Sequence, residues 1–212
     1  TAGLIITQGP YSSFAARWAA APGFRGLRLN TVMPVPRDRR EERLRYLRSA
    51  CGTRPLWVDL KARQLRVREL ANTPYTAVTI SHRVSCGLPA TVYFDNGRIA
   101  ARLADIDGDR LILEGYAGRL IGPGESVNIP DASLAFLDGD LLTEGDLEWI
   151  EACRSMGIHH YMLSFAESAE DISRVREADP EAVVMAKIES RKGLASLDAI
   201  VEAADLVLAA RG

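Results

Sequence analysis

The 212-residue sequence has few cysteines and none of the short motifs that identify a function directly. Its three cysteines, Cys51, Cys86 and Cys153, are too few and too scattered for a disulfide framework or a Cys-x-x-Cys metal site, so a reducing, cytoplasmic compartment is expected. The sequence contains no glycine-rich phosphate loop, dinucleotide-binding fingerprint, nucleophile elbow or zinc-ligand spacing. Any chemistry must therefore come from residues outside these motifs.

Long apolar runs and an excess of charge of one sign are also missing. No apolar run approaches the roughly 20 residues of a membrane span, and we expect no signal peptide at the start. The 26 basic and 28 acidic residues leave a formal net charge of −2, which argues against a nucleic-acid partner. The one basic run lies between Arg37 and Arg68, and its first part, residues 37–48, alternates signs and is typical of the solvated face of an amphipathic helix. We therefore expect no membrane and no nucleic acid among the partners.

Histidine is equally scarce. His159 and His160 are adjacent, so on a strand their side chains point to opposite faces and are poor joint metal ligands. His82 is isolated and is interpreted as structural. The candidate chemistry consequently depends on lysine, arginine and carboxylate side chains.

Apolar patterning predicts strands and helices in alternation over two stretches of the chain. The predicted strands are residues 4–7, 26–30, 56–60, 160–164, 182–188 and 206–210. The predicted helices are residues 13–20, opened by a Ser13 cap, 39–50, 143–156, capped by Thr143, 169–177 and 194–203. Alternation of this kind is typical of an α/β fold with a parallel sheet.

Residues 75–127 have a different pattern. Short runs with a period of two are separated by turn signals, among them Asp95-Asn96-Gly97, a candidate hairpin turn. The pattern predicts a small antiparallel β module inserted after the third strand. We therefore divide the chain into a first α/β part (1–74), the β insertion (75–127) and a second α/β part (128–212).

Lys187 and Glu189 end one of the predicted strands. The preceding residues 183–186 are continuously apolar, as in a parallel strand that is covered on both faces. Side chains at i and i+2 share a face, so the ammonium and the carboxylate project together and need a partner such as a metal ion, a phosphate or a carboxylate. The next strand ends at Arg211 and Gly212. Because parallel strands open onto one rim, where ligands bind, we expect a ligand site there.

Six segments, in the same order, resemble the pyruvate kinase family. AKIES…ARG (186–212) resembles the AKIEN…ARGDLG signature, and DLKARQLRV resembles DTKGPEIRTG. The six segments are residues 6–13, 26–30, 59–67, 124–140, 161–172 and 186–212. The resemblance implies a (β/α) barrel of the TIM type, here partial, with six strands, a shortened β insertion after strand 3 and no C-terminal domain. An open parallel sheet exposes unpaired edges, so either the sequence is truncated or another copy completes the barrel, and a homo-oligomer is expected.

The resemblance also implies roles for individual residues. Lys187 resembles the lysine that stabilises the phosphoryl group in flight, and Arg28 and Arg66 resemble two arginines that bracket this phosphate. Glu189 resembles the ligand of a divalent metal, Mg²⁺ or Mn²⁺. The structural alternatives are a plain ion pair between Lys187 and Glu189 and an exposed surface arginine at Arg66.

Further positions match the family's ligand-binding residues. Asn30 and Asp59 resemble two ligands of the family's monovalent cation, but Val32 and Leu60 replace the other two, so K⁺ is doubtful as a cofactor. Three other matches complete the set: Lys61, Ser164, and the Arg211-Gly212 turn that resembles the holder of the substrate carboxylate.

The resemblance leaves three functions open. The first is phosphoryl transfer between phosphoenolpyruvate and ADP with Mg²⁺. The second is a pyruvate- or enolate-handling lyase, aldolase or decarboxylase of the same fold that has lost the nucleotide site. Glu167 favours it, because this carboxylate stands where the family has an arginine and would repel ADP. The third is a non-catalytic paralogue that binds a phosphorylated metabolite or assembles with a partner.

Overall fold

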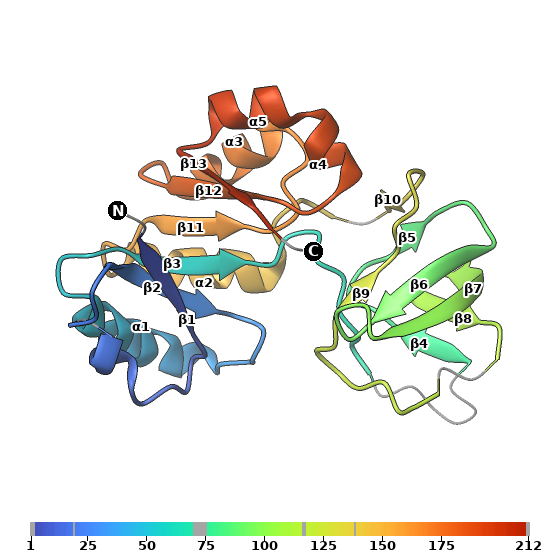
Figure 1. Ribbon diagram of the computed structural model, residues 1–212, viewed down its shortest axis with the longest axis horizontal. Helices are drawn as coiled ribbons and strands as arrows, with labels where there is room; N and C mark the ends of the chain where they lie inside the picture. Colours follow the sequence, from blue (N-terminus) through green and yellow to red (C-terminus); the bar gives the residue numbers. More distant parts are fainter. Residues whose placement is uncertain (1–2, 19, 70–75, 116–117, 138, 211–212) are drawn as a thin grey trace. The chain divides into compact units, whose positions relative to one another are not determined.

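The computed structural model describes residues 3–18, 20–69, 76–115, 118–137 and 139–210 (Figure 1). These residues form two compact units. Unit 1 contains the described residues within 1–62, 141–189 and 193–211, and unit 2 contains those within 63–140 and 190–192. The three-part division predicted from the sequence stays a prediction, and each unit is described by itself.

Unit 1 is built on one parallel sheet of six strands. In spatial order they are β1 (Leu4–Gln8), β2 (Phe24–Asn30), β3 (Leu56–Leu60), β11 (His160–Leu163), β12 (Val183–Ile188) and β13 (Leu206–Ala209). Every neighbouring pair is parallel. The sheet is curled like half of a barrel (Figure 1), which confirms the expectation of a partial α/β barrel.

Five α-helices accompany the described chain: α1 (Arg37–Cys51), α2 (Glu144–Arg154), α3 (Ala169–Ala178), α4 (Arg191–Ala195) and α5 (Leu197–Ala203). Helix α2 begins at Thr143 as predicted. The Thr143 hydroxyl accepts from the backbone N–H of Asp146, and the Asp146 side chain accepts from the backbone of Thr143, so the two residues form a capping box.

One helix prediction was wrong, and a second is confirmed except for a break. The predicted helix at 13–20 is only a 3₁₀ turn, η1 (Ala15–Trp18), in which Arg17 N–H donates to the Phe14 carbonyl three residues earlier. So few residues form too few α-helical hydrogen bonds to offset the cost of nucleation. The predicted helix at 194–203 is interrupted at Ser196, which leaves the helical conformation (φ −102°, ψ 16°) and begins α5 instead.

The two faces of the sheet in unit 1 differ in chemistry. One face packs on the helices, and the large core joins strand residues such as Leu29, Val58 and Leu163 to helix residues such as Leu47 and Ile172. Alternate residues point to the other face, where a smaller apolar cluster contains Trp57, Met162 and Met185. Two residues beyond Trp57 and Met185, on this same face, come Asp59 and Lys187. We call this face, which lies opposite the helices, the inner face.

Unit 2 has its own sheet and core. Five antiparallel strands are ordered β4 (Ala77–Thr79), β8 (Arg110–Leu113), β7 (Ile99–Asp107), β6 (Ala90–Phe94) and β9 (Val127–Asn128), and β5 (Val84–Ser85) pairs with β10 (Ala135–Phe136). Asp95 and Asn96, with φ of 50° and 54°, turn the chain between β6 and β7. Positive φ at both residues is what a tight hairpin turn requires.

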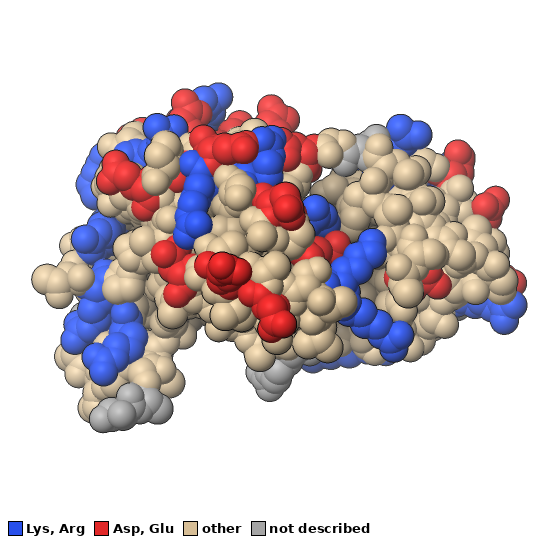
Figure 2. All heavy atoms as spheres, turned by 90° about the horizontal axis from the view of Figure 1, so that it is seen from above, with Lys and Arg blue, Asp and Glu red and all other residues tan. Residues whose placement is uncertain are grey.

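Charges on the surface are mixed. On the face shown in Figure 2, basic and acidic side chains are interspersed. None of the helices within the described ranges combines the length and the apolar character that a membrane crossing requires.

Candidate active site on the inner face

The predicted charged residues of unit 1 meet around the carboxylate of Asp59. Strand β3 places this side chain on the inner face, where it is 1% exposed. Arg28 Nη2 lies 2.8 Å and Lys61 Nζ 2.7 Å from Oδ2, and Lys187 Nζ lies 2.9 Å from Oδ1. One buried carboxylate therefore holds three cationic side chains, one from β2, one from the residue after β3 and one from β12.

Strand register explains why these residues meet. Asn30 of β2 is opposite Asp59 of β3, so Arg28 lies two residues earlier on the same face. On the other side, Asp59 is opposite Met162, and Met162 is opposite Met185. Lys187, two residues after Met185, therefore points to the same face as Asp59. Its side chain reaches Asp59 past Met162 of the intervening strand β11.

The three cations keep Asp59 ionised. Burial alone would raise its pKa, but the positive charges of Lys61, Lys187 and Arg28 outweigh burial and hold the pKa well below its ordinary value. Counting Glu189 with Asp59, three cations face two carboxylates, so one positive charge is in surplus. A site with this balance favours an anionic ligand.

Glu189 lies beside Lys187, as the spacing predicted. Its Oε2 is 3.7 Å from Lys187 Nζ, and its side chain is 10% exposed. The same oxygen accepts from the backbone N–H of Phe165 at 3.0 Å, and Phe165 has a positive φ of 49°. Glu189 is thus oriented by the turn after β11.

The donor set differs between the expected divalent ion and the doubtful monovalent one. No group of three or more His, Cys, Asp or Glu side chains is close enough to hold a metal ion within the ranges that the structure describes. Glu189 supplies one hard oxygen, which suits Mg²⁺ because this ion usually keeps several waters and substrate oxygens in its shell. A monovalent cation fits less well. Lys61 Nζ already binds Asn30 Oδ1 at 3.1 Å and Asp59 Oδ2 at 2.7 Å, and the side chains of Val32 and Leu60 offer no oxygen.

The remaining predicted site residues lie in other surroundings. Ser164 is completely buried, and its hydroxyl donates to the Leu60 carbonyl at 2.7 Å, so it links β11 to β3. Arg66 belongs to unit 2, where Nη1 donates to the Gly124 carbonyl at 3.1 Å. Arg211 and Gly212 lie outside the described residues. The backbone N–H of Glu167 donates to Asp171 Oδ2 at 2.8 Å.

Three residues that contact this site were missed by the sequence interpretation. Thr7 Oγ1 accepts from Arg28 Nη1 at 3.3 Å, and Thr31 Oγ1 donates to the Asp59 carbonyl at 2.6 Å. Asp146 binds the backbone of Lys61. Only Asp146 had a signal in the sequence, since it stands three residues after the Thr143 cap, but that signal predicts a helix start rather than a contact with Lys61.

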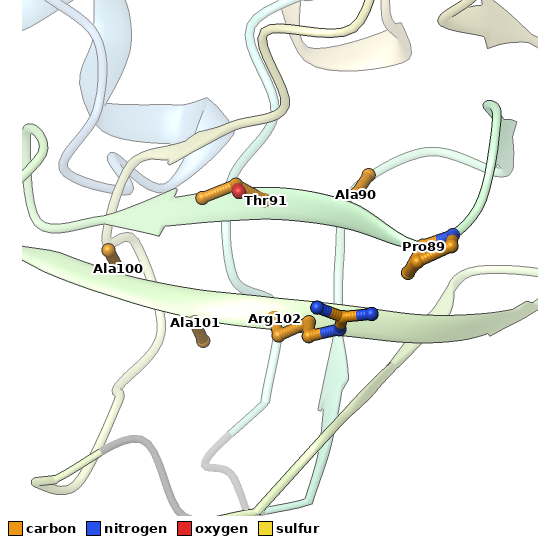
Figure 3. Close-up of a pocket in the computed structure, with 6 residues that line it drawn as sticks. All are labelled: Pro89, Ala90, Thr91, Ala100, Ala101 and Arg102. Atoms are coloured by element: carbon orange, nitrogen blue, oxygen red, sulfur yellow. The ribbon is translucent and has the colours of Figure 1, made fainter.

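Unit 2 has an open hollow of about 340 Å³ that is lined by residues of β6 and β7 and by Pro89 (Figure 3). Its lining is Pro89, Ala90, Thr91, Ala100, Ala101 and Arg102. Arg102, the one ionisable group in this lining, pairs through Nε with Glu114 at 2.8 Å. The hollow therefore offers no cluster of reactive groups, and the inner face of unit 1 is the candidate active site.

A family model and several known proteins match part of this chain. The family model described as pyruvate kinase, barrel domain, matches residues 58–212. Pyruvate kinase of Lactococcus lactis subsp. lactis (strain IL1403) is 32% identical over 131 residues, covering 58% of this chain and 26% of that protein. The Agrobacterium vitis enzyme is 34% identical over 119 residues (56% and 24%), and human pyruvate kinase PKLR is 30% identical over 125 residues (57% and 21%).

The matched part of the chain therefore spans about a quarter of the length of these relatives. The family model covers most of the chain, and it includes Asp59, Lys61, Lys187 and Glu189. On this match, together with the curled parallel sheet, the chain belongs to the pyruvate kinase family.

Proposed function

We propose that the chain is part of an enzyme that transfers a phosphoryl group between phosphoenolpyruvate and ADP. The observation that carries the proposal is the group of three cations on buried Asp59, with one positive charge in surplus. Phosphoryl transfer accumulates negative charge on the equatorial oxygens of the phosphoryl group, and fixed positive charges stabilise it. The family of the chain and its named relatives support the same reaction.

In this proposal Lys187 and Arg28 act on the phosphoryl group. Asp59 holds both side chains, so little reorganisation is needed when charge develops. The Arg28 side chain is 28% exposed, so its guanidinium reaches the open side of the site and offers a planar fork of donors. Glu189 would hold Mg²⁺ or Mn²⁺, and a bound divalent ion would supply further positive charge for phosphate and carboxylate oxygens.

We further propose roles for the parts that lie outside this cluster. Arg66 would bracket the phosphate, Ser164 would support the site, and Arg211 with Gly212 would bind the substrate carboxylate, as the family resemblance implies. Unit 2 would be the counterpart of the capping insertion, because its antiparallel strands follow β3 in the chain. A homo-oligomer would cover the edge strands β1 and β13 of the parallel sheet. Cytoplasmic location follows from the family in the same way.

One experiment distinguishes a kinase from a lyase and from a non-catalytic paralogue. The protein is incubated with phosphoenolpyruvate, ADP and Mg²⁺, and ATP and pyruvate are measured together. Pyruvate is incubated in parallel in D₂O without nucleotide, and exchange of its methyl protons is followed by NMR. ATP formed in step with pyruvate supports the kinase. Proton exchange without ATP formation supports an enolate-handling lyase, and neither signal supports the non-catalytic paralogue.

Replacing Glu189 with glutamine is expected to weaken Mn²⁺ binding in the presence of oxalate at least about tenfold, because an amide oxygen carries no net charge for a hard cation. Calorimetry on wild type and Glu189→Gln measures the change. Glu202→Gln, an exposed substitution on α5, is the matched control and should bind as the wild type does. Equal binding by Glu189→Gln and wild type would place the metal elsewhere.

Potassium is expected to have little effect, because the Lys61 ammonium already binds Asn30 and Asp59. A cation that does not bind gives no stabilisation, so the wild-type melting midpoint should agree within about 1 °C in KCl and in tetramethylammonium chloride of equal ionic strength. The variant Lys61→Met removes the ammonium from both oxygens, and K⁺ should then raise its midpoint. A midpoint that rises in K⁺ for the wild type would overturn this expectation.

A further inference from the structure

Asp146 of helix α2 has a buried carboxylate that the proposed chemistry does not use. It is 2% exposed, and both its oxygens are occupied. Oδ1 accepts from the Lys61 N–H at 2.7 Å, and Oδ2 accepts from the Ala62 N–H at 3.0 Å. Oδ2 also accepts from the Thr143 N–H at 3.0 Å and the Thr143 hydroxyl at 2.8 Å. We propose that Asp146 is a positioning residue, which fixes the backbone at Lys61 and Ala62 so that the Lys61 ammonium stays on Asp59 and Asn30.

Capping of α2 does not account for these contacts. Helix α3 has a capping box of the same kind, in which Asp171 is equally buried. The hydrogen bonds described for Asp171 Oδ2 come from the start of its own helix, from Glu167 N–H at 2.8 Å and Ser168 N–H at 3.2 Å. Asp146 performs the same local task for Thr143 and also binds two amides that lie 85 and 84 residues earlier in the chain. These two additional bonds are the ones that we assign to positioning.

The backbone at Ala62 requires such a partner. Ala62 has a positive φ of 45°, which alanine rarely adopts because its Cβ approaches the following carbonyl oxygen. Its side chain is fully buried in the core of unit 1. Lys61 stands between this strained residue and strand β3, and its Nζ reaches Asn30 Oδ1 and Asp59 Oδ2. A backbone that relaxed at Ala62 would carry the Lys61 side chain away from both oxygens.

Asp146 also ties together the two ends of a long connection. Ala62 is the last residue of unit 1 before the chain enters unit 2, and the chain returns to unit 1 at Leu141. Asp146 binds Ala62 on the outgoing side and Thr143 on the returning side. Asp146 therefore fixes the backbone of unit 1 at both places where the chain leaves it and returns, next to Lys61.

Amide hydrogen exchange followed by NMR tests this role without any substrate. In Asp146→Asn one acceptor oxygen is replaced by a donor, so exchange should become at least about tenfold faster at the amide that loses its acceptor, Lys61 or Ala62. The matched variant Asp171→Asn should leave these two amides within about twofold of wild type. The amide of Val184, which binds Asp205 at 2.8 Å, reports on global opening in every variant.

Two results would overturn the proposal: unchanged exchange at Lys61 and Ala62 in Asp146→Asn, or equal acceleration there and at Val184. If Asp146→Asn does not fold, Thr143→Ala decides, because it removes the cap hydroxyl and leaves both acceptor oxygens for Lys61 and Ala62. If the two amides stay protected from exchange in Thr143→Ala, the result supports the Asp146 carboxylate as their partner. If they lose protection, the protection is assigned to the helix cap.

A second experiment measures enzymatic turnover, and it rests on the proposed function. Asp146→Asn should lower kcat/KM for phosphoenolpyruvate about tenfold, while Thr143→Ala should stay within about twofold of wild type. Asp146→Glu keeps the charge and should recover part of the loss. An Asp146→Asn variant with wild-type kcat/KM contradicts the positioning role. Absence of turnover in every protein, the wild type included, contradicts the proposed function instead and leaves the exchange result to decide the role of Asp146.

Discussion

Replacing Lys187 with methionine is expected to lower kcat about 100- to 1000-fold while unit 1 stays folded, since the loss of one preorganised charge costs about 2.7 to 4 kcal/mol of transition-state stabilisation. Methionine keeps most of the lysine stem and removes only the ammonium. Asp59 keeps Arg28 and Lys61 as partners, so its charge is not left uncompensated. Steady-state turnover of phosphoenolpyruvate, with circular dichroism as the check on folding, measures the effect.

Lys192→Met is the control for this prediction. Lys192 is an exposed lysine that donates to the Leu134 carbonyl and has no contact with Asp59 among the described interactions. Its replacement should leave kcat unchanged. Wild-type turnover by Lys187→Met would refute the catalytic assignment and leave the ion pairs with Asp59 and Glu189 as the role of this residue.

Replacing Asp59 with asparagine is expected to destabilise unit 1 by about 3 to 5 kcal/mol, the usual cost of removing one partner from a buried group of charges. The substitution leaves Arg28, Lys61 and Lys187 close together with no carboxylate between them. Urea unfolding measures the loss. Glu151→Gln is the matched control, because Glu151 and Arg37 form an ion pair with side chains 69% and 70% exposed. An exposed pair of this kind contributes about 0 to 1 kcal/mol.

The same carboxylate gives the stability a defined pH dependence. The pKa of Asp59 is lower in the folded chain than its ordinary value of about 3.9, so the unfolded chain binds more protons around that pH. The stabilisation from Asp59 is then complete above about pH 4 and is lost as the pH falls below it. Wild type should lose more stability than Asp59→Asn between pH 6 and pH 3. Parallel curves for the two proteins would show that Asp59 is not held ionised by its neighbours.

The strands and one part of the site were predictable from the sequence because their signals are local. Four apolar residues before Lys187 indicate a buried strand, and the spacing of Lys187 and Glu189 places them on one face whatever surrounds them. The meeting of Lys187 with Asp59 is different, since it depends on the order of β3, β11 and β12 in the sheet. The family resemblance supplied that order, and periodicity alone would not have done so.

Other features could not be predicted because a distant partner determines them. The bond from Lys61 N–H to Asp146 joins residues that are 85 positions apart. The Ser164 hydroxyl donates a hydrogen bond to the Leu60 carbonyl, and the sequence does not reveal which acceptor a serine hydroxyl binds. The 3₁₀ turn at Ala15–Trp18 and the break at Ser196 could not be predicted either. In short helices and at helix ends, the differences in helix propensity between residues are too small to decide the conformation.

The alternation between the two faces of the parallel sheet restricts which changes in length unit 1 tolerates. In β12 the buried residues Val184 and Ala186 pack on the helices, while Met185 and Lys187 point to the inner face. Deletion of a single residue from this strand would shift its register by one and turn the Lys187 ammonium into an apolar core. A conservative replacement within the strand leaves every side chain on its own face of the sheet, whereas a deletion moves the side chains beyond it to the opposite face. Natural variation in length among homologues is therefore expected in the connection through unit 2 and in surface loops, and to be absent from β3, β11 and β12.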